Sequence, residues 1–203
     1  MKIKICGITT SQEALWLRES GVDYAGFVQF YEKSKRNLSV DKANEIMSAL
    51  EDTVKAVAVT VQPTMLQVEQ IADAGFDIIQ IHGEVSDEVI QMSRIPVWKA
   101  FNVKDLSAFE KYEKMENVVG YVFDAQTPGS GKMFDWSVLD CIPKTKKTVM
   151  LAGGLNPENV SQAIRKFGNR MDGVDTSSGV ENDNGIGKSR EKILRFVKAV
   201  NTN

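Results

Sequence analysis

The chain has 203 residues, of which 42% are hydrophobic and 26% are charged, as is ordinary for one soluble globular domain. The net charge of −2 gives no reason to expect binding to nucleic acid, and no apolar run is long enough to span a membrane. The two cysteines, Cys6 and Cys141, form no CxxC motif, and one histidine is too few for a Cys/His zinc site. We therefore expect a cytoplasmic protein without a metal centre.

Short apolar segments rich in Val and Ile alternate with amphipathic segments along the chain. The predicted strands are Lys2–Cys6, Tyr24–Val28, Thr53–Val61, Asp77–Ile81, Val97–Ala100, Val118–Phe123, Lys147–Leu151 and Gly173–Asp175. Because most of them are apolar on both faces, they suit parallel strands that are buried on both sides.

Helical spacing occupies the segments between these strands. Four apolar stripes fall at i, i+3, i+4 and i+7, namely Ala43/Ile46/Met47/Leu50, Val68/Ile71/Ala72/Gly75, Val160/Ala163/Ile164/Phe167 and Ile193/Phe196/Val197/Val200. Thr10 with Glu13, and Thr64 with Gln67, predict capping boxes, and Asn156 before Pro157 predicts a helix N-cap. Shorter helices are predicted over Ser86–Met92 and Ser137–Cys141.

Eight β-α units in about 200 residues predict a single-domain (β/α)8 TIM barrel that spans residues 1–203. An open, doubly wound sheet is the alternative architecture. That fold usually needs fewer strands and carries a glycine-rich turn after its first strand, where this chain has only Gly7.

Polar residues stand where three of the strands end: Cys6, His82 and Asp124. In a barrel the carboxyl ends of the strands meet at one mouth, where active sites lie. A carboxyl group that closes an apolar strand suits a general acid if its surroundings raise its pKa. Each residue also has a simpler interpretation: Cys6 as a small buried residue, Asp124 as a helix cap, and His82 as a hydrogen-bonded structural residue.

Two glycine-containing loops follow the last two strands, AGGL at 152–155 and SSGVE at 177–181. These loops are the common phosphate site of such barrels, because backbone N–H groups there can hold a dianion. They are also consistent with two ordinary tight turns. A basic run after the second strand contains Lys33, Lys35 and Arg36, and it suits either a solvated face or a loop that binds a carboxylate, for which arginine is the better partner.

Six of these segments, in register and in order, resemble the phosphoribosylanthranilate isomerase family over nearly the whole chain. They are KICGIT (4–9), AGFVQFYEKSKRNLS (25–39), QIHG (80–83), FDAQTPGSGKMFDW (123–136), LAGGLNPENV (151–160) and GVDTSSGVE (173–181). The resemblance implies an isomerase of tryptophan biosynthesis that converts N-(5-phospho-β-D-ribosyl)anthranilate to 1-(2-carboxyphenylamino)-1-deoxy-D-ribulose 5-phosphate. The reaction is an Amadori rearrangement that needs no cofactor, and the enzyme would be a monomer or a homodimer.

The resemblance also implies roles for single residues. Cys6 would be the general base and Asp124 the general acid, and Arg36 would hold the anthranilate carboxylate. The backbone around Gly153, Gly154, Ser178 and Gly179 would bind the phosphate. Asp175 would contact sugar hydroxyls. From its place alone, His82 shares the rim with Asp124 and suits a supporting polar role in substrate binding. The chain departs from the family in its longer loop VQFYEKSKRN and in Ser189, where relatives often have Asp, which leaves loop closure and the start of the last helix open.

Two other functions would also suit a phosphate-binding barrel. A related phosphate-binding barrel of histidine biosynthesis acts on an aminoaldose, but that chemistry usually uses two aspartates, and Cys6 occupies the place of one of them. A barrel that merely binds a phosphosugar, as a sensor or scaffold, is expected to have lost at least one of the two acid-base residues, and both are present.

Overall fold

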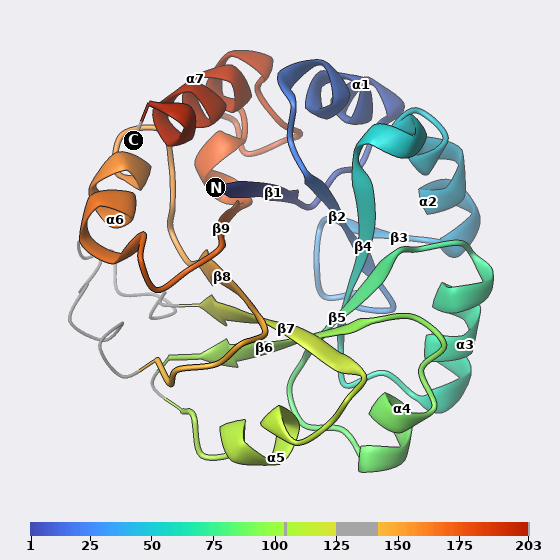
Figure 1. Ribbon diagram of the computed structural model, residues 1–203. Helices are drawn as coiled ribbons and strands as arrows, with labels where there is room; N and C mark the ends of the chain where they lie inside the picture. Colours follow the sequence, from blue (N-terminus) through green and yellow to red (C-terminus); the bar gives the residue numbers. More distant parts are fainter. Residues whose placement is uncertain (104, 125–141, 203) are drawn as a thin grey trace.

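The computed structural model describes residues 1–103, 105–124 and 142–202. Within these residues, eight parallel strands form a closed ring that is surrounded by helices (Figure 1). They are β1 (Lys2–Cys6), β2 (Tyr24–Gln29), β4 (Lys55–Val61), β5 (Ile78–His82), β6 (Val97–Asn102), β7 (Val118–Asp124), β8 (Thr148–Ala152) and β9 (Gly173–Thr176). Strand β1 pairs in parallel with both β2 and β9, which closes the barrel. The (β/α)8 prediction is therefore confirmed, and the open doubly wound sheet is excluded.

The helices cover the outside of this ring (Figure 1). They are α1 (Ser11–Ser20), α2 (Val40–Met47), α3 (Met65–Asp73), α4 (Asp87–Gln91), α5 (Phe109–Glu113), α6 (Val160–Phe167) and α7 (Arg190–Asn201), with short 3-10 helices η1 (Glu51–Thr53) and η3 (Ser178–Val180). Most residues of the predicted apolar stripes are buried beneath them, including all four of α6 and all four of α7. Each stripe thus packs its helix against the strands.

The core of the barrel has two layers. Between strands and helices lies the larger cluster, in which the ring of Phe101 contacts those of Phe109, Tyr112, Tyr121 and Phe123. The smaller cluster includes Val57, Val59, Ile78, Trp98, Ala100, Val122, Met150 and Ala152. Cys6 and Tyr24 pack against this second cluster, so the thiol belongs to the barrel interior rather than to the layer under the helices.

Several predicted boundaries are wrong by a few residues, each for a local reason. The third barrel strand begins at Lys55 rather than Thr53, because Glu51–Thr53 form η1. An extra short strand, β3 (Asn37–Leu38), pairs with β2 and was not predicted. Helix α6 begins at Val160 with Asn159 at its N-cap, not at Asn156. The side chain of Asn156 accepts from the backbone N–H of Glu158 and Asn159, which holds a turn ahead of the helix.

The predicted capping boxes at Thr10/Glu13 and Thr64/Gln67 are both present. Ser189 accepts from the N–H of Lys192 and caps α7, so the departure at this position still starts the helix. Glu13 does more than cap α1: its carboxylate accepts from the N–H of Lys188 at 2.6 Å, which ties the first turn of α1 to the segment before α7.

The loop 125–136, the short helix expected over Ser137–Cys141 and Cys141 itself lie outside the described residues. Across the part of the chain that the structure describes, no helix combines the length and apolarity needed to cross a membrane.

Candidate active site

A cavity of about 140 Å³ lies among residues at the carboxyl ends of the barrel strands. It is lined by Cys6, Val59, Gln80, His82, Val122, Asp124, Ala152, Gly153, Gly154, Leu155, Asp175, Thr176, Ser177 and Ser178. All the predicted site residues except Arg36 and Gly179 are therefore brought together around one space. The barrel achieves this because its parallel strands end at the same rim.

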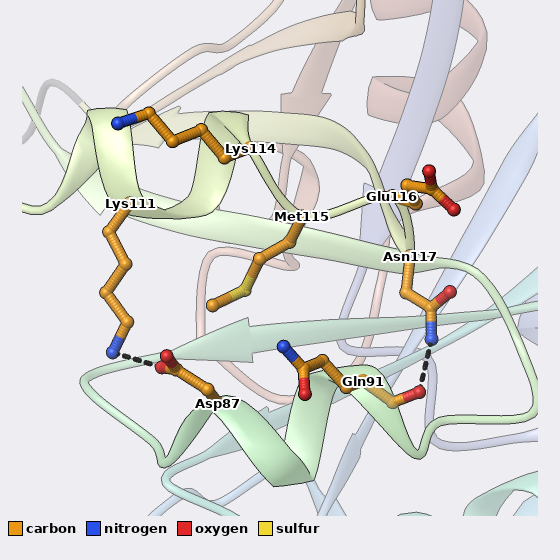
Figure 2. A pocket seen from close by; sticks show the side chains of 7 residues that line it. All are labelled: Asp87, Gln91, Lys111, Lys114, Met115, Glu116 and Asn117. Carbon is orange, nitrogen blue, oxygen red and sulfur yellow. Dashed lines mark hydrogen bonds and ion pairs between the residues drawn. The ribbon is translucent and has the colours of Figure 1, made fainter.

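A larger hollow of about 620 Å³ lies between α4 and α5 on the outer surface (Figure 2). Three of its polar side chains are engaged with one another or with backbone: Lys111 pairs with Asp87 at 2.5 Å, and the Asn117 amide donates to the Gln91 carbonyl at 2.8 Å. Lys111 and Asp87 are about half exposed, so solvent screens their charges. Size therefore does not locate the reactive site in this molecule, whereas the chemistry of the lining residues does.

Cys6 is a free, partly buried thiol at the end of β1. Two contacts fix the backbone there. The Ser177 hydroxyl donates to the Cys6 carbonyl at 2.9 Å, and the Gly26 carbonyl accepts from the N–H groups of Gly7 and Ile8. Gly7 has φ +79 and would place a Cβ against the side chain of Arg36, so glycine is required both by conformation and by space. The end of β1 is thus held in place at the cavity, with the Arg36 side chain against Gly7.

Asp124 ends β7, on the other side of the ring from β1 (Figure 1). Asp124 pairs in register with Asn102 of β6 and Ala152 of β8, so the strands on both sides fix its backbone position. Both Cys6 and Asp124 line the same cavity. The two groups predicted to move protons therefore face one space from strands on different sides of the barrel.

Asp175 of β9 lies deep in the cavity and is bonded to a lysine from β1. Lys4 is fully buried, and its ammonium donates to Asp175 Oδ2 at 2.8 Å. Burial alone would lower the pKa of Lys4, but attraction to Asp175 and Cys6 outweighs it and holds that pKa above its ordinary value. Asp175 Oδ1 is also buried and has no hydrogen-bond partner among the described residues. A buried acceptor in a cavity wall is free for a ligand's hydroxyl group.

The loops after β8 and β9 form one side of the cavity. The loop after β8 contains two glycines with positive φ, Gly153 (+100) and Gly154 (+66). A Cβ on Gly154 would meet nothing within 4 Å, so this glycine faces open space. In the part of the chain that is described, the N–H groups of Gly153, Gly154, Ser178 and Gly179 donate to no protein acceptor. Backbone donors left unpaired around a cavity suit an anion such as a phosphate.

Gly179 contributes by packing rather than by lining the cavity. A Cβ there would collide with the carbonyl of Leu155, and it would lie 2.9 Å from Asn156 Cβ. The Thr176 hydroxyl donates to the same Leu155 carbonyl at 2.6 Å. The two loops are therefore locked against each other, which fixes the spacing of their N–H groups.

His82 lines the cavity beside Gln80, which lies two residues earlier on β5. The Gln80 amide donates to His82 Nε2 at 2.8 Å. Burial, together with the positive charges of Lys4 and Lys99, lowers the pKa of His82 to about 4. The ring is therefore neutral at physiological pH, which suits hydrogen bonding better than proton donation.

The low pKa of His82 in the folded protein predicts that this side chain lowers the stability of the fold in acid. An unfolded histidine titrates near ~6.5, so between about pH 6.5 and pH 4 the unfolded chain binds a proton that the folded protein does not. Stability therefore falls as the pH falls through this window. We expect His82→Gln to show a smaller loss of Tm than the wild type when the pH is lowered from 7.5 to 4.5, measured by circular dichroism. Equal losses in the two proteins would place the protonation of folded His82 much nearer pH 6.5.

Arg36 lies at the rim beside Cys6 and is held by Glu181. Arg36 Nε and Nη2 each lie 2.6 Å from Glu181 Oε1, and Lys35 Nζ lies 3.1 Å from Oε2. Burial acts to raise the pKa of Glu181, but hydrogen bonds from Arg36 and Lys35 and the charge of Lys188 lower it below its ordinary value. The basic run is thus anchored to the loop after β9, and Arg36 is placed next to the cavity rather than in its wall.

Four polar residues of the site were not predicted: Lys4, Gln80, Thr176 and Glu181. Lys4 and Gln80 each precede a predicted site residue by two positions on a strand. Since side chains at i and i+2 share a face, this spacing is a signal that could have found them. Thr176 adjoins and Glu181 ends the predicted SSGVE segment, but their partners, Leu155 and Arg36, lie elsewhere in the sequence. Among the described residues, no cluster of three or more His, Cys, Asp or Glu side chains is arranged to hold a metal ion.

Comparison with known proteins gives a consistent result over the full chain. Residues 3–199 match the family model of N-(5′-phosphoribosyl)anthranilate isomerase. The chain is 40% identical over 202 residues to the N-(5′-phosphoribosyl)anthranilate isomerase of Geotalea uraniireducens, and the match covers 97% of each chain.

Solved structures of isomerases also match this chain in fold and over its full length. The phosphoribosyl anthranilate isomerase of Thermotoga maritima is 36% identical, with a TM-score of 0.84 and complete coverage of both chains. A second isomerase structure, 34% identical with a TM-score of 0.81 and complete coverage, holds reduced 1-(o-carboxyphenylamino)-1-deoxyribulose 5-phosphate. A third, from Thermotoga maritima, is 34% identical with a TM-score of 0.80 and complete coverage, and is described as monomers generated from a dimeric enzyme.

Proposed function

The chain belongs to the N-(5′-phosphoribosyl)anthranilate isomerase family, and we propose that Cys6 and Asp124 are the base and the acid with which it carries out the family's reaction. The protein is an isomerase of tryptophan biosynthesis that converts N-(5-phospho-β-D-ribosyl)anthranilate to 1-(2-carboxyphenylamino)-1-deoxy-D-ribulose 5-phosphate. The reaction moves protons within one molecule, so acid-base groups suffice for it and we expect no cofactor.

The phosphosugar part of the substrate fits the polarity of the cavity. Its phosphate binds the free N–H groups of Gly153, Gly154, Ser178 and Gly179, whose loops are locked together through Leu155. The unpartnered Asp175 Oδ1 accepts from a sugar hydroxyl. His82, neutral and fixed by Gln80, contributes a further hydrogen bond to the substrate. These contacts orient the sugar between the two acid-base groups.

The chemistry then proceeds in one proton transfer by Asp124 and one by Cys6, followed by a tautomerisation that protonates C1′ and releases the C2′ hydroxyl proton. Asp124 protonates the ring oxygen of the ribose, and the ring opens to a Schiff-base cation. Cys6, as the thiolate, removes the proton from C2′, which is acidified by the adjacent cation, and the enolamine that results tautomerises to the ketone. A thiolate suits this step because it is a base of moderate strength. The observation that carries this proposal is that Cys6 and Asp124 line one cavity together with the two glycine loops.

The competing activity is isomerisation of the aminoaldose of histidine biosynthesis. Cys6 stands where two-aspartate enzymes of that kind have one of their carboxylates, so we expect this substrate to react poorly. The test is a direct assay of the purified protein on both compounds, following the fluorescence decay of phosphoribosylanthranilate and the conversion of the aminoaldose. Rapid turnover of the aminoaldose alone would refute the proposed assignment, and turnover of neither compound would favour a phosphosugar-binding protein.

Arg36 is proposed to hold the anthranilate carboxylate at the rim. A carboxylate has two acceptor oxygens that a guanidinium matches bidentately, and the side chain already lies across Gly7 beside Cys6. We expect Arg36→Met to raise KM strongly and Arg36→Lys to restore it only in part, measured by steady-state fluorescence. Lys33→Met, an exposed change in the same basic run, is the matched control and should leave KM unchanged.

A substrate analogue without the ring carboxylate separates binding of the carboxylate from other roles of Arg36. The effect of Arg36→Met should shrink for this analogue, because the lost contact then has no partner. An equal loss for both compounds would show that Arg36 acts through Glu181 on the loops instead, and Lys33 or Lys35 would become the better candidates for the carboxylate.

We also propose that residues 1–203 form one domain, since a single family model spans residues 3–199. A reducing cytoplasm is the proposed compartment, because a catalytic thiol must stay reduced. The described dimer of a relative supports either a monomer or a homodimer for this chain. Size-exclusion chromatography with light scattering distinguishes the two.

A further inference from the structure

Lys4 is a buried charge that the proposed reaction does not yet use. It lies on β1 two residues before Cys6, and its side chain is fully buried in the barrel interior. The rest of the interior cluster is made of residues such as Val57, Trp98 and Met150. A buried ion pair among apolar residues rarely stabilises a fold, and replacing such a pair with apolar side chains is often neutral or stabilising. The Lys4–Asp175 pair therefore calls for a role other than stability.

The position of the ammonium indicates that role. Lys4 Nζ and Cys6 Sγ converge over Gly26 of β2: the point where a Gly26 Cβ would lie is 3.1 Å from Nζ and 2.9 Å from Sγ. The two atoms are therefore no more than about 6 Å apart, within the distance at which an opposite charge favours the ionised form of a group. Gly26, which pairs with Cys6 in register, leaves the space that allows this approach.

Two other cations lie near the thiol. Arg36 is paired with Glu181. Lys188 Nζ lies 3.5 Å from Glu181 Oε1 and donates to the Ser177 carbonyl; burial lowers the pKa of Lys188, while attraction to Cys6 and Glu181 opposes that shift. His82 is neutral. The negative charge of the Asp175 carboxylate disfavours a thiolate, and its pairing with Lys4 offsets part of that charge. Lys4 differs from these two cations in lying on the same strand as Cys6, and Asp175 Oδ2 holds its ammonium over Gly26 beside the sulfur.

We propose that Lys4 is a positioning residue that holds Cys6 as a thiolate, ready to accept the C2′ proton. This inference rests on the proposed role of Cys6 as the base. The ammonium favours the anionic sulfur in the resting enzyme, and it remains charged after the sulfur has taken up the proton. Lys4 itself transfers no proton and acts only through the Cys6 sulfur.

The test measures the thiolate directly, without substrate. In a Cys141→Ser background, the rate at which iodoacetamide alkylates Cys6 is followed between pH 5.5 and 9.5. We expect Lys4→Met to be alkylated about ten-fold more slowly than its parent at pH 7, with both rates converging at high pH. Lys4→Arg, which keeps the charge, should stay close to the parent. Lys2→Met is the matched control on the same strand: Lys2 is exposed and pairs with Asp23, so its loss should change nothing.

A double variant, Lys4→Met with Asp175→Asn, separates the charge of Lys4 from the effect of leaving Asp175 unpaired. It removes both members of the buried pair and so leaves no unpaired buried charge. It can therefore replace the single variant in the alkylation test if that variant does not fold. Slow alkylation at pH 7 in the double variant supports the proposal. Recovery of the parental rate would show that the unpaired Asp175 carboxylate, rather than the lost ammonium, had suppressed the thiolate, and would overturn it.

Kinetics provide the second readout and separate this inference from the proposed function. In Lys4→Met the acidic limb of the kcat/KM profile should move to higher pH, while kcat near pH 9 approaches the parental value. If Cys6→Ser is inactive but Lys4→Met has the same pH profile of Cys6 alkylation as its parent, only the inference about Lys4 fails. If Cys6→Ser keeps its activity, the assignment of the base fails, whatever the alkylation shows.

Discussion

Replacing Cys6 with serine should lower kcat by about 10²–10⁴-fold, the usual contribution of a general base. Serine keeps the size of the side chain and its place beside Gly26 and the Ser177 contact, but its hydroxyl is not ionised at neutral pH. The loss should therefore fall on kcat much more than on KM. Steady-state fluorescence assays of phosphoribosylanthranilate measure both constants.

Cys141→Ser is the matched control for this change and should keep near-parental kcat. Circular dichroism and thermal unfolding should show that both serine variants remain folded. If Cys6→Ser retained near-full kcat, Cys6 would be a packing residue of the interior cluster and another group would have to abstract the proton.

Asp124→Asn should cause a loss of similar size, about 10²–10⁴-fold in kcat, for a different reason. The amide is isosteric and can still accept from its neighbours, but its N–H protons are far too weakly acidic to be transferred to the ribose ring oxygen. The strand pairing of Asp124 with Asn102 and Ala152 uses backbone atoms only, so the fold should persist. The same fluorescence assay measures the effect.

Asp87→Asn is the matched control for Asp124→Asn. Asp87 lies in the outer hollow between α4 and α5, where its only described ion-pair partner is the exposed Lys111 (Figure 2). An exposed pair of this kind contributes little, so kcat and Tm should change little. A large loss at Asp87 with little loss at Asp124 would move the reactive site from the barrel mouth to the outer surface.

The fold could be predicted because each of its elements carries a local signal. Parallel strands buried on both faces read as apolar runs, and the helices read as stripes with caps at Thr10 and Thr64. The strand ends were less predictable. Asn102 and Asp124 are polar, yet each continues the ladder with the neighbouring strand. Such extensions depend on the pairing partner rather than on the residue itself.

The candidate site was predictable to the extent that strand order determines it. Cys6, His82, Asp124 and the two glycine loops converge simply because they follow strands of one barrel. The ion pairs were not predictable in this way. Lys4 meets Asp175 across 171 residues of sequence, and Arg36 meets Glu181 across 145. A lysine within an apolar strand gives no sign of its partner until the barrel closes β1 against β9.

The same limit explains Arg36. From sequence, the KSKR run suited either a solvated face or a loop that binds a carboxylate. The structure shows that a carboxylate does bind it, but that carboxylate is the chain's own Glu181. The prediction that substrate also binds there remains open to the KM measurements on Arg36→Met and the analogue without the carboxylate.

The assignment of Asp124 as the acid and Cys6 as the base is tested most directly by single-turnover kinetics with phosphoribosylanthranilate deuterated at C2′. If Cys6 removes this proton, Cys6→Ser makes C–H cleavage the slow step, and product formation should show a large primary isotope effect. If Asp124 opens the ring, Asp124→Asn makes ring opening the slow step, and its isotope effect should fall close to one. The opposite pattern, with the isotope effect expressed in Asp124→Asn and absent in Cys6→Ser, would contradict the assignment of both residues.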